Sequence, residues 1–114
     1  MIRITNITDE PIQRHLVLFE EEDIITLTLR FYPKTQHWTF DIEFKDKAIY
    51  GIKLSTGVLH MTSKNLPFDF FVVDRSGLGF DPFQRDDFAS GRCRLYMMET
   101  EDMVRIRSGA EVDF

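Results

Sequence analysis

The side chains best able to do chemistry, three His and one Cys, stand far apart in this sequence. His15, His37 and His60 show neither the H-x-x-x-H nor the C-x-x-C spacing that metal sites favour. Cys93 lies with Leu95 and Met97 on the apolar face of an expected strand, where a thiol is usually buried and inert. We therefore expect no metal site, no cofactor and no cysteine nucleophile.

The carboxylates and glycines form no recognisable catalytic motif. Glu20 to Asp23 are four consecutive acids, but neighbours on a strand point to opposite faces, so we expect a solvated turn. Asp86 and Asp87 could pair as acid and base, yet adjacent residues rarely converge, and a loop or capping role is favoured. Gly77 and Gly79 resemble part of a phosphate loop that lacks its third glycine and its helix. The sequence predicts that the protein is not an enzyme.

Composition narrows the class of protein further. With 114 residues, the chain is expected to form a single β domain, 1–114, around one core. A net charge of -5 argues against a nucleic-acid surface, and no apolar run approaches the roughly 20 residues of a membrane span. The lone Cys and the absence of an apolar signal core indicate synthesis in a reducing cytoplasm.

A predicted three-stranded meander from Ile24 to Leu54 is the element around which the rest of the chain must pack. Apolar residues alternate with polar ones along three runs, which is typical of antiparallel strands with one buried face. The first run has its apolar residues at odd positions and the second at even ones, so the loop between them must hold an even number of residues. Pro33 has no N–H for a ladder and suits the start of a loop, which predicts the four-residue loop Pro33 to Gln36. The predicted opposed pairs are Tyr32 with His37, Phe31 with Trp38, and Leu29 with Phe40.

The third run has even apolar positions like the second. This parity requires a loop with an odd number of residues, and Lys45 to Lys47 give a three-residue loop. Phe44 is then opposite Ala48 and Trp38 opposite Leu54. The core residues expected from these faces are Leu27, Leu29, Phe40, Ile42, Tyr50 and Ile52.

The remaining elements complete an all-β fold, a small antiparallel sandwich or roll built on this three-stranded meander. Residues 1–11 are expected to form a short strand or an N-terminal arm, and 99–114 a tail with a short C-terminal helix. Phe68 to Val73 is apolar at every position except Asp69, so both faces should be covered, either by a second sheet or by another subunit. Arg92 to Met98 is the last expected strand.

A long aperiodic loop, Arg75 to Gly91, carries three Phe residues where polar residues are the rule. We expect Phe88 to fold back onto the core. The candidate interface is predicted to be Phe80, Asp81, Pro82 and Phe83, with Asp81-Pro82 at the tip of the loop. Pro82 stiffens the chain there, and a preordered aromatic ring loses little entropy on docking.

Several segments together resemble the small baseplate plug proteins of contractile-tailed bacteriophages. The segments that carry the resemblance are Phe31-Tyr32-Pro33, Trp38-Thr39-Phe40-Asp41-Ile42, Gly51-Ile52-Lys53-Leu54, Leu66-Pro67-Phe68-Asp69-Phe70 and Asp87-Phe88-Ala89-Ser90-Gly91-Arg92-Cys93-Arg94-Leu95-Tyr96. The resemblance implies a non-catalytic virion structural protein, located in the tail baseplate, that plugs or organises its centre. Its implied partners are the hub, tube and spike proteins and further copies of itself.

Another class of function remains open from the residues alone. A small β-barrel that binds a ligand or a peptide would show the same strand pattern. An assembly part should differ from it by associating, or by exposing more apolar surface than monomers tolerate.

Overall fold

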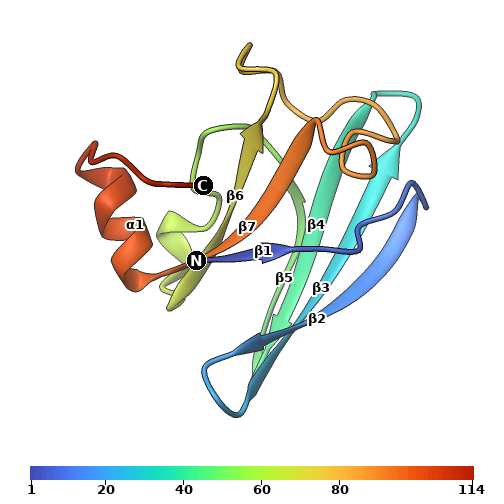
Figure 1. Ribbon diagram of the computed structural model, residues 1–114. Helices are drawn as coiled ribbons and strands as arrows, with labels where there is room; N and C mark the ends of the chain where they lie inside the picture. The colour runs from blue at the N-terminus through green and yellow to red at the C-terminus, as the bar shows by residue number, and fades with distance from the viewer.

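The computed structural model describes residues 1–114 and shows two antiparallel sheets packed face to face, with one short helix (Figure 1). One sheet has the strand order β2-β3-β4-β5 and the other the order β1-β7-β6. The predicted small all-β sandwich is confirmed. The strands and helix are β1 (Ile2–Ile4), β2 (Ile12–Phe19), β3 (Asp23–Tyr32), β4 (His37–Phe44), β5 (Lys47–Lys53), β6 (Phe68–Asp74), β7 (Cys93–Glu99) and α1 (Thr100–Arg107), with a 3-10 turn at Thr62–Lys64.

The register of the β3–β4 hairpin follows from alternation together with the place of Pro33. Tyr32 pairs with His37, Phe31 with Trp38 and Leu29 with Phe40, as predicted. The four-residue loop between these strands is also confirmed, since β3 ends at Tyr32 and β4 begins at His37.

The β4–β5 hairpin differs from the prediction. Phe44 pairs with Lys47, so the loop holds two residues, and a β-bulge then places Tyr50 and Gly51 together opposite Asp41. Gly51 has a φ of 71°, which suits glycine, and its N–H donates to the Asp41 carboxylate at 2.7 Å. The expected three-residue loop and the Phe44–Ala48 pair are therefore wrong.

The bulge also reverses which side chains of β5 face inward. Tyr50, predicted to lie in the core, is 65% exposed, whereas Ile49 packs against the core. Beyond the bulge the predicted parity returns: Ile52 packs inward, and the Leu54 N–H donates to the Trp38 carbonyl at 2.9 Å.

The core lies between the two sheets. Leu27, Leu29, Phe40 and Ile42 are fully buried there, as predicted. Aromatic rings from both sheets meet edge to face, for example Phe40 with Phe70, whose ring centres lie 5.5 Å apart.

Both faces of β6 are covered, as its apolar sequence predicts. Phe68, Phe70 and Val72 face the four-stranded sheet, while Phe71 joins a smaller cluster. That smaller cluster contains Phe71, Tyr96, Met98 and Met103 and lies against α1. The expected C-terminal helix is thus present, and it covers the outer side of the second sheet.

The two terminal segments both lie against the second sheet. The opening residues form β1, which pairs with β7 through Ile2, Arg3 and Ile4, so this segment is a strand of the sheet. At the other end, the Phe114 ring stacks on Phe71 with 5.3 Å between ring centres. No helix here has the length and apolar character that crossing a bilayer requires.

Candidate interaction site on the long loop

The loop from Arg75 to Gly91, here called the aromatic loop, connects β6 to β7 without a strand or helix of its own. It begins after Asp74 and ends before Arg92. These two residues and Asp87 hold it in place.

Arg92 makes a two-pronged ion pair with Asp87. Its Nε donates to Oδ1 at 2.9 Å and its Nη2 to Oδ2 at 2.8 Å. Its Nη1 lies 3.1 Å from Asp74 Oδ1. The side chains of Asp74 and Asp87 are only 1% and 2% exposed, and that of Arg92 is 20% exposed, so the network is largely shielded from water.

The pKa values of the network reflect these partners. Burial alone would raise the pKa of Asp74, but hydrogen bonds from Ser76 and Phe80 and the charge of Arg92 outweigh it and lower the pKa to about 2. The pKa of Asp87 is also lowered, because its hydrogen bonds from Arg92 and from two backbone N–H groups outweigh burial. The bond to Asp87 raises the pKa of Arg92. All three groups therefore stay charged at neutral pH.

The network fixes the backbone of the aromatic loop. Arg92 donates to the carbonyl oxygens of Phe80 at 3.3 Å and Asp81 at 2.8 Å, and Asp87 Oδ2 accepts the N–H groups of Phe83 and Gln84 at 2.7 Å each. Asp74 Oδ2 accepts the Phe80 N–H at 2.9 Å. The loop thus has little freedom, although it lacks regular structure.

Contacts from outside the loop tether it further. Thr56 donates its N–H to the Asp81 carboxylate and its hydroxyl to the Phe80 carbonyl, both at 2.8 Å. The Trp38 indole N–H donates to the Gln84 carbonyl at 3.0 Å. The predicted packing of Phe88 is confirmed, since it is 6% exposed and its ring lies 5.4 Å from Trp38.

Two aromatic rings of the aromatic loop remain exposed to solvent. Phe80 is 54% exposed and Phe83 is 37% exposed, and the Arg92 guanidinium lies 5.1 Å from the centre of the Phe83 ring. Pro82 is buried and the Asp81 carboxylate is bonded to Thr56, so Phe80 and Phe83 are the exposed members of the four predicted interface residues. The stiffness of the turn comes from the ion-pair network beneath it. Nearby Leu78 adds a side chain that is 70% exposed.

The other candidate groups do not assemble into reactive centres. Burial raises the pKa of the Cys93 thiol to about 12, which keeps it protonated. Glu20 to Glu22 form an exposed turn, and no three His, Cys, Asp or Glu side chains converge as metal ligands. Asp87 acts as a capping and ion-pairing group for the loop, as its sequence context predicts.

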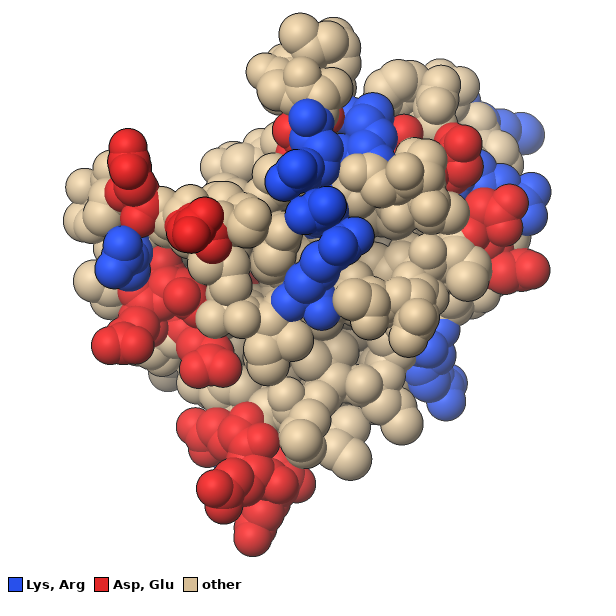
Figure 2. All heavy atoms as spheres, viewed as in Figure 1, with Lys and Arg blue, Asp and Glu red and all other residues tan.

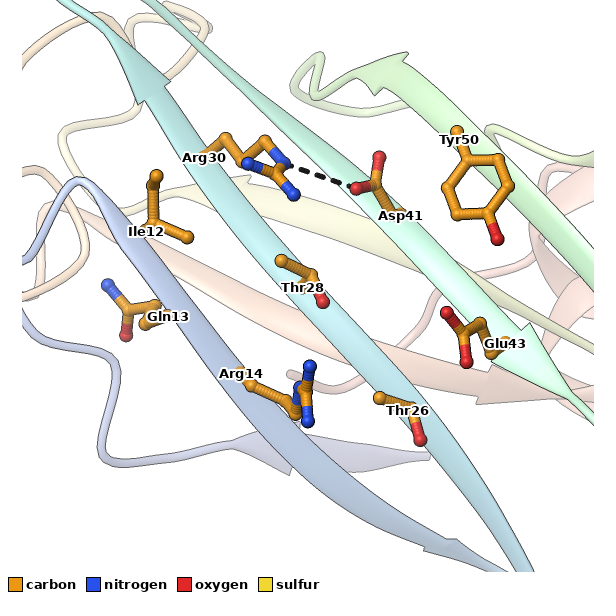
Figure 3. A pocket seen from close by; sticks show the side chains of 9 residues that line it. All are labelled: Ile12, Gln13, Arg14, Thr26, Thr28, Arg30, Asp41, Glu43 and Tyr50. Carbon is orange, nitrogen blue, oxygen red and sulfur yellow. Dashed lines mark hydrogen bonds and ion pairs between the residues drawn. The ribbon is translucent and has the colours of Figure 1, made fainter.

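A shallow hollow of about 470 Å³ lies on the outer face of the four-stranded sheet (Figure 3). Arg14, Arg30, Asp41 and Glu43 line it with balanced charge, and Arg30 pairs with Asp41 at 3.2 Å. Tyr50 stands at its β5 side. The hollow is open to solvent and carries no buried polar group aimed at a ligand, so the aromatic loop is the better defined site.

Sequence reasoning missed three features. It did not identify Arg92 as the centre of a network, because Asp74, Asp87 and Arg92 meet only after folding. It also missed the exposed Leu16 and Leu18 on β2. Finally, net charge conceals the distribution of charge: Figure 2 shows a stripe of Lys and Arg over β7 and β1, with acidic groups gathered elsewhere.

Comparison with known proteins gave one family. The family model described as Cyanophage baseplate Pam3 plug gp18 matches residues 1–101. No curated protein matches the chain.

Proposed function

The chain belongs to the phage baseplate plug family that this model describes, and we propose that it plugs or organises the centre of the tail baseplate, where tube, hub and spike meet. The family gives it a structural role among other baseplate proteins in the virion tail. The central position, the identity of those neighbours and the presence of several copies are our proposal. So are its synthesis in the host cytoplasm and its action as one unit, 1–114. This role requires no catalytic step.

The exposure of Phe80 and Phe83 on a fixed backbone is the observation that supports this proposal. Exposed aromatic rings favour association, and residues of this kind dominate the energy of protein interfaces. Because Arg92 and Asp87 already hold the backbone, docking costs little additional conformational entropy. We assign the pair to contact with a neighbouring baseplate protein.

The proposal is tested by coexpressing the chain with the tube, hub and spike proteins of the same phage. Phe80→Asp and Phe83→Asp should block copurification with these proteins. The melting temperature should fall little, because the lost cation–π contact of Phe83 is worth only about 1 kcal/mol.

Tyr32→Asp is the matched control, since Tyr32 is an aromatic residue 43% exposed outside the aromatic loop. It should copurify like the natural chain. Normal copurification of both Phe variants, or unfolding of the isolated Phe83→Asp chain, would show that the loop is not the interface.

A further inference from the structure

The outer edge strand of the four-stranded sheet, β2, exposes apolar side chains. Ile12, Leu16 and Leu18 are 62%, 68% and 56% exposed, although Val17 and Phe19 on the opposite face are buried. No strand of the sheet lies beyond β2, and a groove of about 300 Å³ runs between it and β1. Such an edge is a template for a further strand.

The opposite edge strand, β5, is also unpaired on its outer side. Tyr50 is 65% exposed there and Ala48 is exposed beside it. Lys45 and Lys47 stand at the N-terminal end of β5, with the exposed Asp46 between them. The Lys45 side chain is 62% exposed, and its Nζ lies 3.5 Å from Asp23 Oδ2 of the same chain. The β5 edge therefore combines an exposed aromatic ring with a turn in which two lysines outnumber one aspartate.

The two edges are complementary in direction. Each neighbouring pair in the order β2-β3-β4-β5 is antiparallel, so β5 runs opposite to β2. When two copies stand side by side in the same orientation, β5 of one meets β2 of the next as an antiparallel neighbour. The β2–β3 turn and the β4–β5 turn lie at the same end of the sheet, so they also become neighbours.

The charges at that end are complementary as well. Glu20, Glu21 and Glu22 form the β2–β3 turn and are all exposed, and Figure 2 shows an acidic tip there. The β4–β5 turn of the adjoining copy would bring Lys45 and Lys47 beside them, together with the single acid Asp46. Opposite charges at an interface rim steer association and fix its register.

The faces of the two strands match in every second register, and one of these registers brings exposed apolar side chains of both strands together. Tyr50 and Leu16 both point to the outer face of the sheet, and Ile49 and Val17 both point to the core. Placing Tyr50 opposite Leu16 puts Ile49 opposite Val17, and it leaves Lys47 opposite Phe19, next to the acidic turn. Tyr50 and Ile49 then each gain an apolar neighbour on their own face.

We propose that the partner of these edges is a second copy of this chain, with β5 of one copy adding antiparallel to β2 of the next. The inference rests on the proposed function in that the baseplate gathers several copies. A contact between two different edges repeats head to tail and builds a ring or a filament. The symmetric alternative, β2 against β2, would place Glu20 to Glu22 near Asp9 and Glu10 of the other copy, where like charges repel.

A cysteine pair tests the register in the assembled baseplate and in the purified chain. Leu16→Cys and Tyr50→Cys in one chain lie three strand spacings apart, roughly 14 Å, which is beyond the span of a disulfide. Oxidation should therefore link separate copies and give a ladder of covalent oligomers. Cys93 is buried and should not react. The control L16C/K34C, with Lys34 in the distant β3–β4 turn, should give no ladder. Absence of a ladder for L16C/Y50C in the assembled baseplate would overturn the proposal.

Charge exchange provides a second test in solution. K45E/K47E and E20K/E21K/E22K should each raise the dissociation constant for self-association about tenfold or more, measured by sedimentation, because rim charges become repulsive. An equimolar mixture of the two should restore it, and K34E/R107E should leave it unchanged. Self-association of K45E/K47E at natural strength would refute the contact. Neither outcome depends on copurification of the Phe83 variant, so the two proposals can fail separately.

Discussion

Replacing Arg92 by Met removes the guanidinium while keeping most of the apolar stem. Two largely shielded carboxylates, Asp74 and Asp87, would lose their cation, and breaking such a buried pair costs about 3 to 5 kcal/mol. Asp74 keeps the Phe80 N–H as a donor, and Asp87 keeps the N–H groups of Phe83 and Gln84. Because these hydrogen bonds remain, we expect a cost of about 3 kcal/mol, at the lower end of that range.

Urea unfolding followed by the fluorescence of Trp38 measures this cost, because the Trp38 indole is bonded to the aromatic loop through Gln84. The cost should be largest at pH 7. It should shrink below about pH 4, where carboxylates without a cation begin to accept protons.

Arg30→Met is the matched control for Arg92→Met. Arg30 also pairs with an acid, Asp41, but its side chain is 40% exposed, so this pair should contribute at most about 1 kcal/mol. If Arg92→Met costs no more than Arg30→Met, the network does not organise the loop. The argument for a fixed aromatic surface then fails.

Four further outcomes are expected. Ile49→Ala should lower the free energy of unfolding by about 2 kcal/mol and Tyr50→Ala by less than about 0.5 kcal/mol in urea titrations, and the reverse order would contradict the bulge. Gly51→Ala should cost about 1 to 2 kcal/mol in the same assay, because its φ of 71° strains any other residue while its Cβ would meet no atom. The pKa of Asp74 is lowered to about 2, so its contribution to stability is present above about pH 4 and is lost as the pH falls through about 2. Asp74→Asn should therefore flatten the dependence of the urea midpoint on pH in that range. An unchanged slope would refute the assignment. Cys93 should resist thiol reagents at pH 8 until the chain unfolds, since burial raises its pKa to about 12, and rapid labelling of the folded chain would be inconsistent with this.

The alternation of apolar and polar residues determined much of this fold before any tertiary contact was known. A strand exposes alternate residues to opposite faces, so the pattern from Ile24 to Phe44 requires a loop with an even number of residues. Pro33, which has no N–H to give to a ladder, then selects the four-residue loop. The Phe31–Trp38 pair follows from that rule. The two-sided burial of β6 and the helix after β7 also follow from local patterns, because periodicity and helix propensity act over a few residues.

Only the tertiary structure decided the rest. The β4–β5 hairpin could have a three-residue loop without a bulge or a two-residue loop with a bulge at Gly51. Alternation alone could not show where the extra residue of β5 lies. The site depends on Asp74, Asp87 and Arg92 meeting at the base of the aromatic loop. Their charges attract strongly there because the packed chain excludes water, and a sequence pattern cannot show that exclusion. For the same reason, the sequence showed that Phe80 and Phe83 were out of place, but only the folded chain could show that they are held at the surface.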